Sequence, residues 1–266
     1  MIKLIAFDMD GTLLNSKGEI LKESISAILN SKNKGCKIVL ASGRPFDALK
    51  KYLHQLLLCS ENEYSICFNG SKIVNNLTKE VIFFKKLDNF NISEANKLSK
   101  ELNLSLMAYS KQEEILYEDL NDDILFEYNL TKNPLKQVMF NNYQEEVIKI
   151  LFSSTKENID RTYNLIKNKY SQDYNVVRTH DKYIEIINKN VSKGNALKYL
   201  LSYLKINKED TMSFGDNDND ISLLLTTKYS YAMKNSSSSE LKNIATEVIT
   251  SNDDIGIAQT INKFFN

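Results

Sequence analysis

The chain is poor in the residues that mark extracellular, fibrous or disordered proteins. Its 266 residues include only three cysteines, two prolines and eight glycines. Cys36, Cys59 and Cys67 form no CxxC or other metal-ligand spacing, and their odd number argues against a disulfide framework. Because 42% of the residues are hydrophobic, collagen-like and disordered classes are excluded. We expect an ordered globular protein in a reducing compartment.

Net charge and long apolar runs are also missing. Lys+Arg and Asp+Glu number 34 each, so no overall basic field exists to hold nucleic acid or an anionic membrane. The apolar run at the N-terminus is too short for a signal peptide, and no stretch approaches the roughly 20 apolar residues of a membrane span. We therefore expect a cytoplasmic protein without nucleic-acid or membrane partners. No pattern in the sequence indicates its oligomeric state.

The first third of the chain alternates short apolar runs with amphipathic stretches. The predicted elements are strand 3–7, helix 21–33, strand 37–41, helix 46–57 and strand 65–68. Gly35 ends the first helix, and Pro45 stands where the second one begins. This order predicts the right-handed parallel crossovers of a doubly wound sheet.

The middle of the chain follows a different pattern. Here we expect helix 93–102, strands 105–109 and 113–117, an unassigned stretch to 143, strand 147–152, helix 158–169 and strands 175–178 and 183–187. A helix followed by two adjacent strands occurs twice, and the short links between the strands favour antiparallel pairing. An inserted α+β domain explains this pattern better than a continued parallel sheet.

The last third returns to crossover order. Its predicted elements are helix 192–204, strand 211–214, helix 221–226, strand 229–233, helix 239–245, strand 247–249 and helix 255–265. The short serine run 236–239 suits a loop and a helix N-cap. We predict an α/β protein with a doubly wound, mainly parallel Rossmann-like core sheet. Residues 1–82 and 189–266 form the core domain, and residues 83–188 form the inserted domain.

Acidic residues follow two of the predicted strands, where the carboxyl ends of a doubly wound sheet meet at one edge. Asp8 and Asp10 come after the first strand, and two carboxylates at this spacing can share a divalent cation. Asp216 to Asp220 follow the strand 211–214, and such crowding of acids is unfavourable unless a cation compensates it. Surface Asp pairs and unliganded acidic loops are the alternatives. An EF-hand is excluded because the loop lacks the required Gly and Glu.

Two further features could bind a phosphate. Ser42 and Gly43 end the second strand, where a hydroxyl and backbone N–H groups at a helix start can cradle an anion. The alternative for Ser42 is a plain N-cap. Lys193 begins a later helix and could neutralise crowded carboxylate and phosphate groups, although a single lysine is usually a solvated surface charge.

In this order, the four features resemble the motifs of the haloacid dehalogenase superfamily, specifically its Cof-type IIB phosphatases with a C2-type cap. The resemblance spans the whole chain. The matching segments are Asp8-Met9-Asp10-Gly11-Thr12, Ser42, Lys193, Gly215-Asp216-x-x-Asn219-Asp220, Asn69-Gly70-Ser71 and Ser251-Asn252-Asp253-Asp254. Lys234 departs from the family, which commonly has glycine there, and implies a backbone that needs no positive φ.

The resemblance implies a Mg²⁺-dependent phosphatase that forms an aspartyl-phosphate. Asp8 would be the nucleophile, and Asp10 would protonate the leaving group and then activate water. The metal would be bound by Asp8, by Asp216 and by the backbone carbonyl of Asp10.

The resemblance also implies how the phosphate and the metal site are supported. Ser42, Gly43, Lys193 and Asn219 would bind the phosphate. Asn219 and Asp220 would support the metal ligands or contact the metal through water.

Three other functions remain open at this point. A phosphotransferase or phosphomutase would share the aspartyl-phosphate and differ in the acceptor. A phosphoryl-accepting signalling domain also gathers acids and a lysine around Mg²⁺, but it needs neither Asp10 nor an insertion of about a hundred residues. A binding protein without turnover is the third alternative.

The identity of the substrate is not encoded in these motifs. Sugar phosphates, pyridoxal phosphate, flavin mononucleotide and nucleotides all fit the resemblance, since a cap favours small phosphorylated metabolites. Arg178, His180, Asp181 and Lys182 link two predicted strands of the insertion. They could reach a substrate or form an ordinary solvated hairpin turn.

Overall fold

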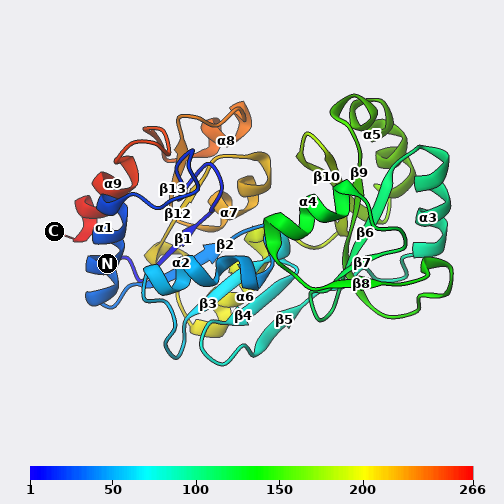
Figure 1. The fold of residues 1–266 in the computed structure, drawn as a ribbon. Coiled ribbons are helices and arrows are strands. Elements are labelled where there is room, and N and C mark those ends of the chain that lie inside the picture. The colour runs from blue at the N-terminus through cyan, green and yellow to red at the C-terminus, as the bar shows by residue number, and fades with distance from the viewer. Residues whose placement is uncertain (266) are drawn as a thin grey trace. The chain divides into compact units, whose positions relative to one another are not determined.

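The computed structural model describes residues 1–265, and the side chains of all of these except Thr179 and His180. The chain forms two compact units. The core unit comprises Met1–Phe84 together with the chain from Ser192 onward, and the cap unit comprises Lys85–Val191 (Figure 1). The first boundary lies two residues beyond residue 82, where the sequence pattern predicts it. The reason is that strand β5 (Val81–Phe84) pairs within the core sheet.

The core unit is built on one eight-stranded sheet in the order β14-β13-β12-β1-β2-β3-β4-β5. Its other strands are β1 (Leu4–Phe7), β2 (Lys37–Ala41), β3 (Tyr64–Cys67), β4 (Lys72–Asn75), β12 (Thr211–Gly215), β13 (Tyr229–Met233) and β14 (Glu247–Ile249). The strands from β14 to β3 run parallel, as predicted. The predicted doubly wound, mainly parallel core is confirmed.

An antiparallel hairpin, β4 and β5, extends this sheet and was not predicted. Its turn is closed by the side chain of Asn75, whose Oδ1 accepts hydrogen bonds from the backbone N–H groups of Leu77 and Thr78. Lys79 completes the turn with a φ of +66°. The sequence pattern hides this hairpin because its first strand has only four residues and begins and ends with polar side chains.

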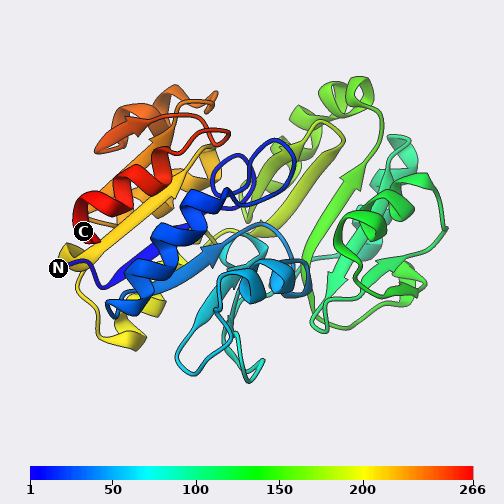
Figure 2. The same cartoon turned by 60° about the vertical axis from the view of Figure 1, so that its left-hand side comes forward.

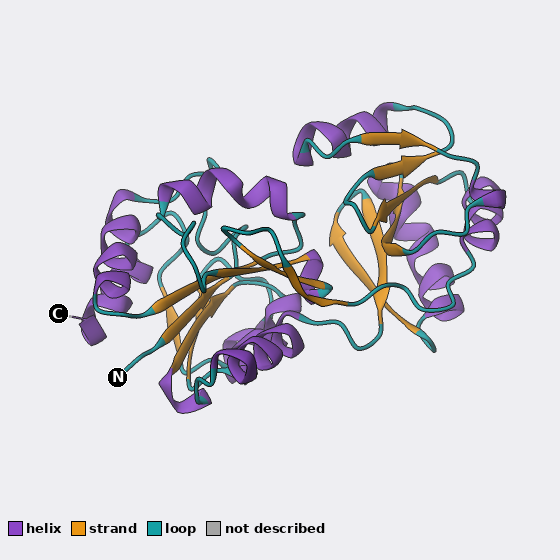
Figure 3. Ribbon diagram, turned by 90° about the horizontal axis from the view of Figure 1, so that it is seen from below, coloured by secondary structure: helices purple, strands orange, loops and turns teal. Residues whose placement is uncertain are grey.

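Helices lie on both faces of the core sheet (Figure 3). They are α1 (Lys22–Asn33), α2 (Lys50–Gln55), α6 (Lys193–Leu204), α7 (Ile221–Thr226), α8 (Ser239–Ile244) and α9 (Gly256–Phe265). Leu197 and Leu200 of α6 and Leu223 of α7 pack against one face of the sheet. Helices α1 and α9 lie side by side (Figure 2).

The helix predicted over residues 46–57 is shorter and less regular than expected. A 3₁₀ turn over Phe46–Leu49 comes first, and α2 follows and ends at Gln55. Leu57 has a φ of +54°, which an α-helix does not permit. Ser238 caps α8 by accepting a hydrogen bond from Leu241, in agreement with the predicted serine N-cap.

The cap unit is an α+β domain with its own six-stranded sheet in the order β10-β11-β9-β6-β7-β8. Its elements are α3 (Ile92–Glu101), β6 (Ser105–Ser110), β7 (Ile115–Tyr117), α4 (Asp122–Thr131), β8 (Leu135–Gln137), β9 (Val147–Ser153), α5 (Lys156–Tyr170), β10 (Tyr174–His180) and β11 (Tyr183–Asn188). The predicted antiparallel pairs β6–β7 and β10–β11 are both present. Helix α4 and strand β8 occupy the stretch that the sequence left unassigned.

The cap sheet has an apolar face and a polar face. Side chains alternate between the two faces of each strand. Leu106 of β6, Ile150 of β9 and Ile184 of β11 all lie on the apolar face, where they form a hydrophobic core with helices α3 and α5. Tyr109 points the other way, and its hydroxyl donates a hydrogen bond to Glu127 of α4. Each unit therefore has its own buried core.

Two properties of the described residues concern membrane helices and cysteines. Within residues 1–265, no helix combines the length and the hydrophobicity that crossing a membrane requires. Cys36, Cys59 and Cys67 form no disulfide within the described residues.

Candidate active site

The carboxyl ends of the parallel core strands bring together segments that are far apart in sequence. Asp8 follows β1, Ser42 follows its neighbour β2, and Asp216 follows β12 on the other side of β1. Because ligands of doubly wound sheets bind at this edge, these loops are the expected position of an active site.

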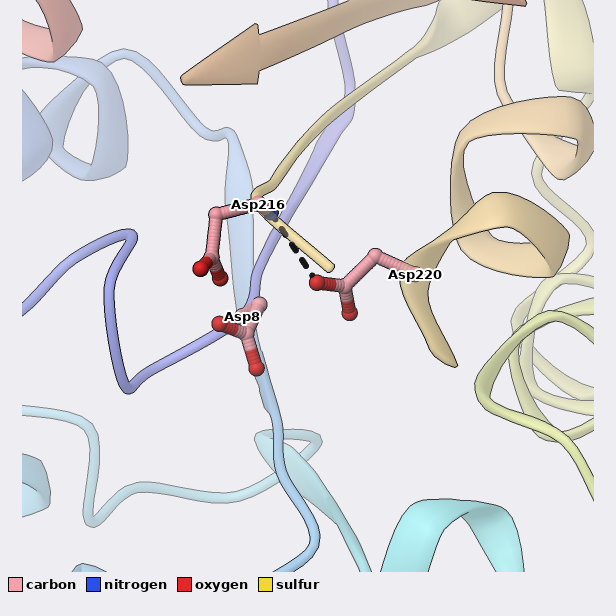
Figure 4. Close-up of side chains that lie close together, drawn as sticks. All are labelled: Asp8, Asp216 and Asp220. Atoms are coloured by element: carbon pink, nitrogen blue, oxygen red, sulfur yellow. Dashed lines mark hydrogen bonds between the residues drawn. The ribbon is translucent and has the colours of Figure 1, made fainter. Parts of the chain in front are cut away.

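Three carboxylates meet at this edge. Asp8, Asp216 and Asp220 each contribute an oxygen, and these oxygens lie within 4.8 Å of one another (Figure 4). Asp8 is only 5% exposed and Asp220 is fully buried. Carboxylate oxygens at this spacing form the kind of donor set that binds a hard divalent cation.

Lys193 provides a positive charge next to these carboxylates. Its side chain is 0% exposed, and its Nζ donates to Oδ1 of Asp8 and, over 2.7 Å, to Oδ1 of Asp220. Burial alone lowers the pKa of the Lys193 ammonium, but the charges of Asp220 and Asp8 outweigh it and raise this pKa above its ordinary value. Lys193 is therefore a cation of this cluster, and the alternative of a solvated surface lysine is wrong.

One lysine does not balance three carboxylates, and the pKa values of Asp8 and Asp216 reflect this. Burial and then the charge of Asp220 raise the pKa of the Asp8 carboxyl well above its usual range. Burial and the same neighbour raise the pKa of Asp216 to about 6. Both carboxyls are crowded by negative charge, which a divalent cation would relieve. The donor set therefore fits a metal such as Mg²⁺.

Asp220 holds the loop that carries Asp216. Its Oδ2 accepts hydrogen bonds from the backbone N–H groups of Asp216, at 3.0 Å, and Asn217, at 3.2 Å. A Cβ on Gly215 would lie 2.5 Å from the Cβ of Asp220, so only glycine lets the loop close this tightly. With Lys193 and two backbone donors around it, Asp220 supports the cluster from its buried side.

The turn after Asp8 depends on Gly11. Its φ is +79°, and a Cβ there would lie 2.4 Å from Oδ2 of Asp216. The hydroxyl of the next residue, Thr12, donates to Oδ1 of Asp216 over 3.0 Å. This turn therefore sets the position of Asp216 as well as that of Asp8.

Side chains from the end of the chain hold the same loop. The Nδ2 of Asn235 donates to the carbonyl of Gly11, and the Nδ2 of Asn252 donates to that of Leu14, each over 2.8 Å. Asn252 lies in one of the segments that match the family motifs, but the match does not indicate that its side chain contacts the Leu14 carbonyl. Lys234, next to Asn235, has no positive φ, in agreement with the inference from its departure from glycine.

The structure does not bring the Asp10 carboxylate into the cluster. This side chain is exposed, and both of its oxygens accept hydrogen bonds from the guanidinium of Arg44, one of them from Nε over 2.8 Å. Bidentate pairing with arginine fixes the orientation of a carboxylate. Arg44 was not predicted to matter, because a single arginine in a loop gives no signal of what it contacts.

Ser42 and Gly43 lie in the loop that follows β2. The Oγ of Ser42 accepts a hydrogen bond from the backbone N–H of Arg44 over 3.1 Å, and Ser42 is 1% exposed. The residue that precedes the 3₁₀ turn is Pro45, so the alternative of Ser42 as a plain helix N-cap is wrong. Gly43 lies against the side-chain amide of Asn69.

Asn219 lies on the exposed side of the acidic loop. Its Nδ2 donates to Oδ1 of Asn69, a buried residue in the loop after β3, over 3.1 Å. Asn69 belongs to one of the segments that match the family motifs, but the resemblance implies no role for it. Its signal is an Asn-Gly pair directly after a predicted strand, which is also the signal of an ordinary turn.

The hairpin of the cap unit carries ion pairs within that unit. Arg178 pairs with Asp160 and Asp181, and Lys182 lies over the ring of Phe126 at 5.2 Å. The side chain of His180 is outside the described residues. These contacts hold the hairpin within its own unit, and both interpretations of the sequence stay open.

The fold and this cluster define a class: a doubly wound α/β protein with an inserted α+β unit and a cluster of carboxylates at the carboxyl edge of its sheet. Comparison with known proteins identifies the family. The family model for haloacid dehalogenase-like hydrolases matches residues 5–261. The chain therefore belongs to the haloacid dehalogenase-like hydrolases, as the sequence motifs indicate.

Individual relatives agree with this assignment. The chain is 32% identical to YxeH of Bacillus subtilis over 99% of its own length and 98% of that protein. It is 28% identical to the phosphatase YwpJ of the same organism, over 97% and 98% of the two chains. The crystal structure of a haloacid dehalogenase-like hydrolase from Bacteroides thetaiotaomicron matches with a TM-score of 0.88 and 26% identity, covering 100% of both chains. The protein is accordingly an enzyme of the phosphatase type.

Proposed function

We propose that the protein is a Mg²⁺-dependent phosphatase that hydrolyses small phosphorylated metabolites through an aspartyl-phosphate on Asp8. The observation that carries the proposal is the position of Asp8, buried at the end of β1 and in contact with Lys193 within a cluster of three carboxylates. This arrangement places a carboxylate nucleophile beside a buried ammonium and a donor set for a divalent cation, the two positive charges that stabilise a transferring phosphoryl group.

The first chemical step belongs to Asp8. An oxygen of its carboxylate attacks phosphorus in line, the new bond from carboxylate oxygen to phosphorus forms, and the ester bond to the leaving alkoxide breaks. Lys193 already donates to Oδ1, which leaves Oδ2 as the oxygen that is free to attack. The buried ammonium also offsets the repulsion between the carboxylate and the phosphate.

Asp10 provides the proton transfers. Its carboxylic acid protonates the leaving alkoxide, and the resulting carboxylate then accepts a proton from the water that hydrolyses the aspartyl-phosphate. The exposure of this side chain supports the role, because a group that meets both leaving group and water must be accessible. The guanidinium of Arg44 orients the carboxylate between these two transfers.

The carboxylates of Asp8 and Asp216 and the backbone carbonyl of Asp10 would hold the metal. When bound, Mg²⁺ supplies electrostatic stabilisation of the charge on the transferring phosphoryl group. Asp220 and Asn219 support this set from outside, Asp220 through its hydrogen bonds to the Asp216 loop. Ser42, Gly43, Lys193 and Asn219 would bind the phosphate oxygens.

The substitution Asp8→Asn tests the proposal. It removes the nucleophile but keeps the shape of the side chain, so we expect no turnover by a protein whose circular dichroism spectrum shows that it is folded. Asp218→Asn is the matched control, since this exposed residue of the same acidic loop has its carboxylate outside the cluster. Wild-type hydrolysis by Asp8→Asn would remove Asp8 from the reaction.

A panel of phosphorylated metabolites, assayed with Mg²⁺ and ranked by kcat/KM, tests the substrate class. It should include sugar phosphates, pyridoxal phosphate, flavin mononucleotide and nucleotides. Release of inorganic phosphate, undiminished by an added sugar acceptor, is the expected result. Transfer to the sugar would instead identify a phosphotransferase or phosphomutase, and the absence of any turnover would favour a binding protein.

A further inference from the structure

The loop that follows β3 has an unusual backbone. Phe68, Asn69 and Gly70 have consecutive φ angles of +51°, +55° and +104°. Residues other than glycine rarely adopt this left-handed region, and Asn tolerates it better than most. Such strain persists only where the surroundings enforce it, and it gathers at functional sites. A connection between two strands does not by itself require these left-handed φ angles, so the loop is a candidate for a further role.

Two neighbouring segments enforce this conformation. The backbone N–H of Phe68 donates to the carbonyl of Arg44 over 3.1 Å, and that of Asn69 donates to the carbonyl of Ser42 over 3.0 Å. On the other side, a Cβ on Gly70 would lie 2.2 Å from the carbonyl oxygen of Ser192, the residue before Lys193. The loop is thus fastened between the two segments that carry Ser42 and Lys193.

The side chain of Asn69 is buried with one half of its amide unused. The residue is 4% exposed, and its Oδ1 accepts the hydrogen bond from Asn219. Its Nδ2 lies against Gly43, where a Cβ would be 3.1 Å from it, and it donates to no group among residues 1–265. Nδ2 is not among the fully buried unpaired atoms of the described chain, so this donor is accessible on an otherwise buried side chain and is available to a ligand.

Two other donors beside Asn69 are also unused. The hydroxyl of Ser42 accepts from Arg44 but donates to nothing in the described chain, and the backbone N–H of Gly43 likewise makes no hydrogen bond there. A hydroxyl, a backbone N–H and a side-chain amide on adjoining loops form a set of donors without acceptors. An anion with several oxygens is the ligand that this set fits.

We propose that Asn69 is a phosphate-binding residue, whose Nδ2 donates to an oxygen of the substrate's phosphoryl group beside Ser42 and Gly43. The inference rests on the proposed function and adds a residue to its site. Asn219 fixes the orientation of the amide through Oδ1, which leaves Nδ2 directed to the ligand. Asparagine suits this position because it combines a left-handed backbone with a donor of the right length.

Two substitutions at this position test the proposal. Asn69→Gly keeps the left-handed backbone and removes the amide. Asn69→Asp keeps an acceptor for Asn219 but replaces the donor with a negative charge. The control is Asn62→Asp, the same change at an exposed residue that also has a left-handed φ, +61°. Circular dichroism and melting temperature establish which variants are folded. If Asn69→Asp is unfolded, Asn69→Gly alone tests the proposal.

The primary measurement is calorimetric binding of inorganic phosphate in the presence of Mg²⁺. Losing one hydrogen bond to a charged group weakens binding on the order of ten- to a hundredfold. We expect the phosphate Kd to rise by about this factor in Asn69→Gly and further in Asn69→Asp. The Mg²⁺ activation constant should stay within about twofold of wild type, because Nδ2 faces the phosphate and not the metal. A merely structural role would shift both constants together.

A second measurement separates this inference from the proposed function. Hydrolysis of para-nitrophenyl phosphate by the wild type tests the function itself. If the wild type binds phosphate but hydrolyses nothing, the proposed phosphatase function is wrong. The comparison of phosphate Kd values between wild type and variants then still decides the role of Asn69. An unchanged phosphate Kd in folded Asn69→Gly, or no phosphate binding by the wild type, would overturn the inference.

Discussion

The side chain of Lys193 balances much of the negative charge in the active site. Burying an ammonium is costly unless opposite charges surround it, and Asp8 and Asp220 meet this requirement. The same contacts hold Asp8 in one orientation. A mobile surface lysine could provide the charge but not this orientation.

A prediction at this scale concerns Gly11. Alanine there would meet Oδ2 of Asp216 at 2.4 Å and would also strain a backbone with a φ of +79°. We expect Gly11→Ala to lower kcat/KM by at least about tenfold, because Asp216 must move. Gly18→Ala is the matched control, with a φ of +73° but no atom within 4 Å of the new Cβ. Equal losses of activity in the two variants would contradict the steric explanation.

The three thiols allow a second prediction. Burial raises the pKa of Cys36 from 9.0 to about 12, so its thiolate fraction at pH 8 falls by about a thousandfold. Cys67 is buried as well, whereas Cys59 is partly exposed. We expect iodoacetamide at pH 8 to alkylate Cys59 alone, as read by mass spectrometry. The guanidinium-unfolded protein should be labelled three times, and rapid labelling of Cys36 in the folded protein would contradict the prediction.

At the scale of elements, the active site depends on how closely helices approach one another. Gly194, the residue after Lys193, lets α6 contact α7, because a Cβ there would lie 2.1 Å from the carbonyl oxygen of Ser222. Its backbone N–H also donates to the Ser222 hydroxyl over 3.1 Å. The position of Lys193 is thus tied to the packing of two helices.

The substitution Gly194→Ala tests this dependence. Forcing α6 and α7 apart should destabilise the protein by about 1–3 kcal/mol, the usual range for overpacking. It should also lower kcat by at least about tenfold, since Lys193 moves with its helix. The control is Lys198→Ala on the exposed face of α6, which should change neither quantity. A stable, fully active Gly194→Ala would show that the helices can separate without cost to the site.

At the scale of the whole molecule, the chain has two separately packed units. The cap unit contains an ion pair of its own, between Lys149 of β9 and Glu185 of β11, which are 4% and 5% exposed. Removing one partner of such a pair leaves a buried charge uncompensated and costs about 3–5 kcal/mol.

We therefore predict that Lys149→Met loosens only the cap unit. Amide hydrogen exchange should accelerate in the cap strands β6, β9 and β11 and stay unchanged in the core strands β1, β2 and β12. Replacing Glu185 by Met as well should restore most of the lost protection, because no unpaired charge then remains. Uniform acceleration across both units would mean that they unfold together.

Local sequence patterns account for most of the elements. Strands β1, β2 and β12 are buried apolar runs, and each was predicted to within one residue. The β4–β5 hairpin and helix α4 were missed or left unassigned because their residues mix polar and apolar types without a clear period. Their stability comes from the sheet or core on which they pack.

By itself, the sequence determined the alternation of elements, the insertion and the motifs that contain Asp8, Ser42, Lys193 and Asp216, because these depend on residues that are close along the chain. Only the tertiary structure decided that Lys193 is buried, that Asp10 faces Arg44 and that Asn69 holds an unused donor beside Gly43. Asp8 and Lys193 are 185 residues apart. Burial and charge pairing act through space between such residues, and no local pattern encodes which of them will meet.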